Sequence, residues 1–255
     1  MIKLKKITKC CSRFIPVKAA SLHGFGRAER KLMLFKIIDK NEFNRMVDLM
    51  LVSNEVIGPR RIETGINGKP IYQYLPVQSR AELDLDYETT EIPAKTYFLP
   101  YKENLSAWHF QEGDWTQEIS YRLKPRAIIG LHACDINGLL KLDKVMTRDF
   151  FPSPYYISRR KNTFIVGIDH KPCSGAFCRS LGTDSVDRGF DLFLTDLGDR
   201  YFVAIGTERG FTTLNKVTVT EVTEKDTADY LDVRREIAAG FGPDLDVKLL
   251  PKLMD

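Results

Sequence analysis

The sequence predicts an α/β fold, a mixed sheet with parallel core strands, flanking helices and added β-hairpins. Two compact apolar runs, PRAIIGLHA and NTFIVGID, have the length and composition of buried parallel strands. A stretch with helical periodicity, CDINGLLKLDKVM, lies between them, and alternation of strand, helix and strand is typical of α/β proteins. The 255 residues, 43% of them hydrophobic, are enough to bury a substantial core.

The first elements are expected between residues 39 and 108. Asp39 is a candidate helix N-cap with Glu42 at the capping-box spacing, and apolar residues follow at helical spacing: Phe43, Met46, Val47 and Met50. Gly58-Pro59 is expected to end this segment. The stretch GINGKPIYQYLPV predicts a hairpin with its turn at Asn-Gly, and TYFLPYKENLSAW predicts an extended piece that runs into a short helix.

The later elements follow the first apolar run. The helix after it is expected to place five apolar side chains on one face: Leu139, Leu140, Leu142, Val145 and Met146. FDLFLTDLGDRYFVAIG predicts two strands joined by a tight turn at Gly198-Asp199, and the segment from 218 onward should end in a helix that Gly240 caps. We interpret SPYYISRR as a solvated loop edge; the alternative is an anion or partner site formed by Tyr155, Tyr156, Arg159 and Arg160.

Charge divides the chain near Met33. Residues 1–32 hold nine Lys or Arg and one acid, Glu29, and so carry +8, while the whole chain carries +4; residues 33–255 are therefore at −4. We interpret residues 1–32 as a disordered basic extension upstream of a natural start, the alternative being a targeting or RNA-binding tail. Residues 33–255 are expected to form a single α/β domain with a sub-boundary near 120.

Composition narrows the function classes. The acidic balance of residues 33–255 argues against nucleic acid as a partner, and no apolar run reaches the 18 residues of a transmembrane segment. The five cysteines are not spaced like a secreted disulfide framework, which predicts a reducing, cytoplasmic compartment. The chain has no P-loop, G-x-G-x-x-G, H-E-x-x-H or G-x-S-x-G motif, so it offers no nucleotide motif and no assigned catalytic residue.

Three cysteines lie on two loops that each follow a predicted buried strand. Cys134 stands in GLHACDING, and Cys173 and Cys178 stand in HKPCSGAFCRS. If the two strands are neighbours, the three thiols meet at the carboxyl edge of the sheet, where open α/β proteins bind ligands. Thiolates gathered there would suit zinc or an iron–sulfur cluster as a metal site.

A complete metal site needs a further ligand, since four are the norm for zinc and for a [4Fe–4S] cluster. Candidates are His170, His132, Asp169 or a group from another subunit. Alternatives remain: Cys134 fills space in the core, the two histidines are ordinary polar groups at strand ends, or Cys134 or Cys178 is the nucleophile of a thiol enzyme.

Four phrases in the same order and at similar spacing resemble a known family: FLPYKENL, KPRAIIGLHACDINGLLKLDKVM, PYYISRRKNTFIVGID and FCRSLGTDSVDRGFDLFLTDLGDRYFV. They resemble the beta subunit of cytoplasmic nickel–iron hydrogenases (sulfhydrogenases) and the related A subunit of anaerobic sulfite reductase. The similarity covers residues 33–255. It implies an electron-transfer subunit that connects a flavin-containing subunit with iron–sulfur and catalytic subunits of a redox complex.

The family pattern is an N-terminal α/β region followed by a ferredoxin-like part with two [4Fe–4S] clusters, and this chain departs from it. It stops at LPKLMD, where the ferredoxin-like cysteines would be expected to start, and Asp169 and Ala176 stand where relatives often carry cysteines. We therefore expect an electron-transfer or assembly subunit of an anaerobic complex, with one [4Fe–4S] cluster held or flanked by Cys134, Cys173 and Cys178. A cofactor-free scaffold is the alternative.

Overall fold

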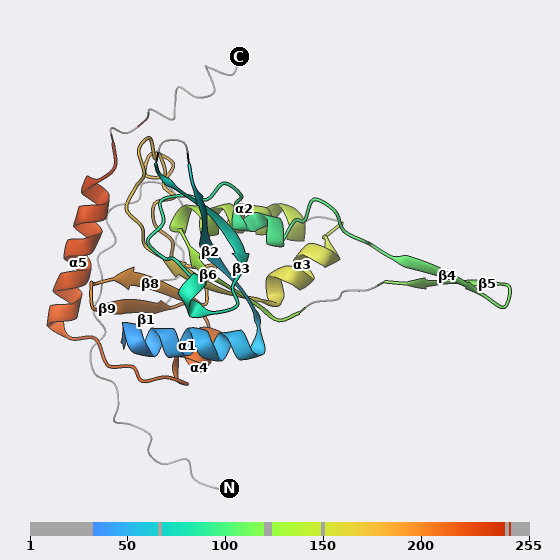
Figure 1. The fold of residues 1–255 in the computed structure, drawn as a ribbon, viewed down its shortest axis with the longest axis horizontal. Coiled ribbons are helices and arrows are strands. Elements are labelled where there is room, and N and C mark those ends of the chain that lie inside the picture. The colour runs from blue at the N-terminus through green and yellow to red at the C-terminus, as the bar shows by residue number, and fades with distance from the viewer. Residues whose placement is uncertain (1–32, 66–67, 120–123, 149–150, 243–244, 246–255) are drawn as a thin grey trace, which may run out of the picture. The chain divides into compact units, whose positions relative to one another are not determined.

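A computed structural model describes residues 33–65, 68–119, 124–148, 151–242 and 245. Its centre is a seven-stranded sheet in the order β1-β9-β8-β7-β6-β2-β3 (Figure 1). The strands of this sheet are β1 (Leu34–Asp39), β2 (Glu55–Thr64), β3 (Pro70–Pro76), β6 (Arg126–Leu131), β7 (Thr163–Ile168), β8 (Leu192–Asp196) and β9 (Arg200–Ile205). Strands β2, β6, β7 and β8 run parallel to their neighbours in this series, and the other pairings are antiparallel. The predicted α/β fold with a parallel core is confirmed.

Helices cover both faces of the sheet. They are α1 (Lys40–Ser53), α2 (Ala133–Thr147), α3 (Pro154–Lys161), α4 (Glu208–Leu214) and α5 (Glu224–Ala239), with short 3-10 helices at Arg80–Glu82 and Ala94–Tyr97. Alternate residues of β6 point to opposite cores: Ala127 and Ile129 pack in the core that contains α1, whereas Ile128 packs in the core that contains α2. Both predicted apolar runs, now β6 and β7, are buried parallel neighbours because helices cover both of their faces.

The first helix has its predicted start but not its predicted cap or end. Asp39 is the N-cap residue, yet within the described residues its side chain makes no capping hydrogen bond. Glu42 instead accepts a 2.7 Å hydrogen bond from the backbone N–H of Thr218, so the predicted capping box is wrong. The helix ends at Ser53, and Gly58-Pro59 lies inside β2, because residues 55–57 already pair with β6.

One other expectation about helices is wrong, and a second holds only in part. TYFLPYKENLSAW does not run into a helix: after the 3-10 turn at Ala94–Tyr97, the described residues 98–119 contain no helix and enter strand β4 (Ala107–Gln111). In α2 the buried stripe is Ala133, Ile136 and Leu139, while Val145 is 70% exposed. Leu142 and Met146 are partly buried against the same core, so the predicted face holds for them and for Leu139 but not for Val145.

The segment SPYYISRR forms helix α3 and is not a loop edge. Ser153 caps it by accepting from the backbone N–H of Tyr156, and Pro154 occupies the first turn, where its missing N–H costs nothing. The Tyr156 ring is fully buried, and its hydroxyl donates to Asp143 at 2.7 Å. The polar neighbours of Tyr156 suggested an exposed loop. Burial of its ring in the core instead stabilises this segment as a helix.

The remaining elements follow the predictions. Strands β2 and β3 form the expected hairpin, although Asn67 of its turn lies outside the described residues. Strands β8 and β9 form the second hairpin, where Gly198 has a φ of 103°. Helix α5 ends at the C-cap Gly240. Residues 1–32, with Cys10 and Cys11, also lie outside the described residues, and the single-domain organisation stays a prediction. In the described part, no helix combines the length and apolarity needed to cross a membrane.

Candidate functional site

The carboxyl ends of β6 and β7 bring the two cysteine loops together. Because the strands are parallel neighbours, Leu131 and Ile168 end at the same edge of the sheet. His132 follows β6 and is the N-cap residue of α2; Asp169 and His170 follow β7. The site is thus built at the edge where α/β sheets bind ligands.

Three rings stack at this edge. His132 and His170 lie parallel, with ring centroids 3.7 Å apart and an interplanar angle of 7°. Tyr87 stacks on the other side of His132 at 4.2 Å and 10°. Among the described residues, the buried Nε2 of His132 has no hydrogen-bond partner. Burial, followed by the neighbouring His170, holds the pKa of His132 well below its usual value, so His132 is neutral at pH 7.

A bulge in β6 positions the tyrosine of this stack. Gly130 has a φ of +89°, and the pairing register with β7 shifts there. The Tyr87 hydroxyl donates to the Gly130 carbonyl oxygen at 2.7 Å. The Tyr74 hydroxyl lies 3.1 Å from the same oxygen and also within hydrogen-bond reach of the Tyr87 hydroxyl, and its single proton is donated to one of these two oxygens. Burial raises the pKa of both tyrosines well above the usual value, so both stay protonated donors.

Two of the three predicted thiols meet here. Cys134, in the first turn of α2, and Cys178, in the loop after β7, share a hydrogen bond between their side chains. Burial, with Asp135 and Cys178 as further causes, raises the pKa of Cys134 to about 12. Cys134 is therefore a protonated thiol at neutral pH, because desolvation outweighs the lowering effect that a helix N-terminus has on a thiol pKa.

Asp135 adds a carboxyl group beside the thiols. Burial raises its pKa to about 6, although the backbone N–H of His132 donates to it and the Lys95 ammonium lies near enough to oppose the shift. A cavity of about 380 Å³ opens at this point, lined by Cys134, Asp135, Lys95 and Lys141 together with mostly apolar residues. A thiol, a carboxyl group and two ammonium groups therefore line the same cavity.

The loop that carries Cys173 and Cys178 is fixed at both sides. The Asn137 side chain on α2 donates to the carbonyls of Thr183 and Ser185 at 3.3 and 2.9 Å. The Arg179 guanidinium donates to the carbonyl of Ala238 in α5 at 2.8 Å. These bonds place Cys178 against Cys134.

The carboxylate of Asp169 is already bound by two side chains of the protein. Its carboxylate, which is buried, accepts from the Thr195 hydroxyl at 2.7 Å and pairs with the Arg234 guanidinium of α5. Burial raises the pKa of Asp169, and the Arg234 charge opposes that shift. Each carboxylate oxygen already accepts a hydrogen bond, so Asp169 ties α5 to β8.

The predicted metal ligands do not form a complete set in this structure. Cys134 and Cys178 are adjacent, but no group of three or more His, Cys, Asp or Glu in the described part of the chain is placed to hold a metal ion. Of the proposed fourth ligands, His170 stacks on His132, and Asp169 is bound by Thr195 and Arg234. As placed, these residues do not fit a [4Fe–4S] cluster, which needs four ligands.

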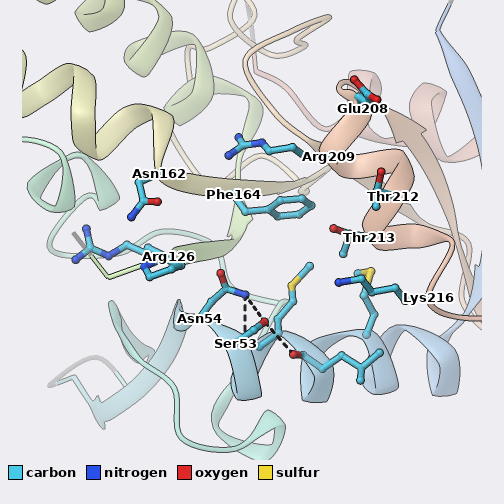
Figure 2. Close-up of a pocket in the computed structure, with 14 residues that line it drawn as sticks. Ser53, Asn54, Arg126, Asn162, Phe164, Glu208, Arg209, Thr212, Thr213 and Lys216 are labelled. Atoms are coloured by element: carbon cyan, nitrogen blue, oxygen red, sulfur yellow. Dashed lines mark hydrogen bonds between the residues drawn. The ribbon is translucent and has the colours of Figure 1, made fainter.

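A second cavity, of about 510 Å³, lies at the opposite end of the strands and contains none of the predicted site residues. It is lined by α1, by the amino ends of β6 and β7, and by α4. Figure 2 shows the Phe164 ring inside it, between the side chains of α4 and α1. Two of its cations are already paired, Arg126 with Glu55 and Arg209 with Asp191.

A comparison with curated proteins identifies a relative. The chain is 35% identical, over 215 residues, to the sulfhydrogenase 2 subunit beta of Pyrococcus furiosus. The chain is a homologue of this sulfhydrogenase subunit. The match covers 84% of this chain and 60% of the relative, so the chain spans about three fifths of that subunit's length. No family model and no solved structure matches the chain. The resemblance to hydrogenase beta subunits is confirmed; the relation to sulfite reductase stays a prediction.

Several residues of the site escaped the sequence analysis. Tyr74, Tyr87 and Lys95 carry no motif, and the first two are placed by the bulge at Gly130, which depends on pairing between distant strands. Asp135 is next to Cys134 in GLHACDING. An acidic residue in the first turn of a predicted helix, beside a candidate ligand, is the feature by which the sequence could have identified it.

Proposed function

We propose that this hydrogenase beta subunit homologue is an electron-transfer or assembly subunit of an anaerobic oxidoreductase complex, of hydrogenase or sulfite-reductase type, in the cytoplasm. The single observation that carries the proposal is the 35% identity to the sulfhydrogenase subunit over 84% of the chain. The partners proposed are flavin-containing and iron–sulfur or catalytic subunits. The thiol pair Cys134 and Cys178, at the ligand-binding edge of the sheet, is consistent with this role.

The experiment is anaerobic purification of the tagged chain from the organism that encodes it. We expect stoichiometric subunits that contain flavin and iron, identified by mass spectrometry and by assays of flavin, iron and acid-labile sulfide. A chain that purifies alone, without iron or flavin, would remove the proposal.

The finer proposal is a [4Fe–4S] cluster bound by Cys134, Cys173 and Cys178, with His170 or Asp169 as the fourth ligand. The set of ligands is incomplete in the positions that these residues occupy. Iron and sulfide reconstitution of the purified chain tests the cluster: about four irons per chain, lost in Cys134→Ser and kept in Cys10→Ser/Cys11→Ser, is the result expected from a cluster of this type.

A cofactor-free scaffold is the second candidate. It is favoured because, among the residues that the structure describes, only two thiols lie together, and because the Asp169 carboxylate is already bound by Thr195 and Arg234. It predicts that Cys173→Ser/Cys178→Ser leaves the subunit composition of the purified complex unchanged. Loss of subunits from a variant whose unfolding midpoint matches the parent would count against the scaffold.

A further inference from the structure

The most exposed element of the described chain is a hairpin. Strands β4 (Ala107–Gln111) and β5 (Asp114–Glu118) form a two-stranded antiparallel sheet of their own, separate from the seven-stranded sheet. All ten strand residues are exposed. The turn residues Glu112 and Gly113 have φ angles of 51° and 94°, which suit a tight two-residue hairpin turn. Figure 1 shows the hairpin extending away from the large sheet.

The two faces of the hairpin differ in chemistry. Directly paired residues share a face, and residues alternate between faces along each strand. The pairs Phe110–Trp115 and Trp108–Gln117 therefore lie on one face, where the rings of Phe110 and Trp115 are 5.1 Å apart. The opposite face carries mainly polar residues: Ala107, His109, Gln111, Asp114, Thr116 and Glu118.

The aromatic face is uncovered. Trp108, Phe110 and Trp115 are 59%, 57% and 67% exposed. A lone two-stranded hairpin is only marginally stable in water, and exposed aromatic clusters are typical of protein interfaces, in which Trp is enriched among the residues that dominate binding. The hairpin thus has the composition of an interface element whose apolar face is buried by something outside the described chain.

The charge of the hairpin selects the kind of partner. Residues 105–119 contain Glu112, Asp114 and Glu118 and no Lys or Arg. This charge opposes binding to nucleic acid or to an anionic membrane surface, both of which attract basic segments. A second copy docked through the same hairpin would bring two segments of like negative charge together. A protein groove with an apolar floor and a basic rim is complementary to it.

We propose that the β4–β5 hairpin is the arm by which this chain docks on another subunit of its oxidoreductase complex, with Trp108, Phe110 and Trp115 inserted into an apolar groove that has a basic rim. The inference rests on the proposed function for the identity of the partner as a redox subunit. The role of the hairpin as a docking element is supported independently, by its geometry and its charge.

The test compares variants of the two faces in the tagged full chain, purified anaerobically from the organism that encodes it. Trp108→Ser/Trp115→Ser alters the aromatic face, and the matched control His109→Ser/Thr116→Ser alters the polar face. We expect the aromatic-face variant to retain about tenfold less of the partner subunit per chain than the parent, and the control to stay within about twofold. Equal retention by both variants would overturn the proposal.

Additional measurements separate lost binding from lost folding and test the charge and the identity of the partner. The unfolding midpoint of each variant is measured, and an unchanged midpoint shows that lost binding is not lost folding. Asp114→Lys/Glu118→Lys should also reduce partner retention, because the new positive charges would repel a basic rim. Full retention would contradict the proposed basic rim of the groove. A partner without flavin or iron that still depends on the aromatic face would support the arm and remove its redox assignment.

The isolated chain provides a direct readout because its two tryptophans, Trp108 and Trp115, are both on the hairpin. Intrinsic tryptophan emission at the wavelength of water-exposed indole, with a monomeric mass by light scattering, is the result expected before the partner is added. Blue-shifted emission in a dimer that the aromatic-face variant dissociates would identify a second copy as the occupant and overturn the proposal.

Discussion

At the scale of single residues, the site depends on a backbone conformation that side chains with a Cβ seldom adopt. Gly130 combines a φ of +89° with close packing, since an added Cβ would lie 2.9 Å from a methyl carbon of Leu85. Its carbonyl orients Tyr87, which stacks on His132. One glycine therefore determines how the rim of the site is arranged.

Gly130→Ala is expected to lower the free energy of unfolding by about 1–3 kcal/mol, because it combines an unfavourable φ with overpacking. Gly138→Ala is the matched control: it lies within helix α2, and a Cβ there meets no described atom within 4 Å. It should raise stability by about 0.5–1 kcal/mol through helix propensity. Urea unfolding of both variants gives the comparison, and equal effects would contradict the strain at Gly130.

The thiol of Cys134 should be unreactive. With its pKa raised to about 12 by burial, a small fraction of it is thiolate at pH 7.5. We expect alkylation by iodoacetamide to be at least about a hundredfold slower than that of free glutathione, because the thiolate is the nucleophile. Mass spectrometry of timed samples measures the rate at this position. Fast labelling of Cys134 in the folded chain would revive the thiol-enzyme alternative.

At the scale of elements, helix α5 begins with a capping box that also carries charge. The Thr223 side chain accepts from the Asp226 N–H, and the Asp226 carboxylate accepts from the Thr223 N–H at 2.9 Å. The Arg200 guanidinium of β9 donates to the same carboxylate at 2.9 Å. Burial raises the pKa of Asp226, but the hydrogen bonds from Thr223 and Arg200 outweigh it and hold the pKa below its usual value.

Asp226→Ala should destabilise the chain by about 1–3 kcal/mol at pH 7, since the cap and the bond to Arg200 are both lost. The folded-state pKa is depressed, so this stabilisation is complete above the unfolded-state value of about 3.9 and is lost as the pH falls through the lower folded value. Unfolding measured from pH 7 to pH 3 should therefore show the difference between parent and variant shrinking below about pH 4. A difference that stays constant over this range would contradict the assignment.

At the scale of the whole molecule, the ion pair of Asp169 and Arg234 connects helix α5 to the sheet. The Asp169 carboxylate lies at the end of β7 and is buried, whereas Arg234 comes from α5, 65 residues later. The same carboxylate accepts from Thr195 of β8. Removal of the arginine would leave a buried charge with only a hydroxyl partner.

Arg234→Met is expected to cost about 3–5 kcal/mol, the range for breaking one side of a buried pair. Its neighbour Arg235 provides the control: it pairs with Asp232 on the surface, where both side chains are mostly exposed, and Arg235→Met should change stability by less than about 1 kcal/mol. Thermal and urea unfolding compare the two variants. Similar small losses in both would show that the Asp169 pair does not hold the helix.

Local sequence determined the parallel core strands, the β8–β9 hairpin and helix α5, because apolar periodicity, a tight Gly-containing turn and a helix-ending glycine are short-range signals. It also placed Cys134 and the loop of Cys178 at one edge of the sheet. Only the tertiary structure decided that Glu42 bonds Thr218, that Tyr156 is buried, that Asp169 pairs with Arg234 and that two thiols meet without a third. Those outcomes depend on partners far away along the chain and on desolvation, neither of which a local pattern specifies.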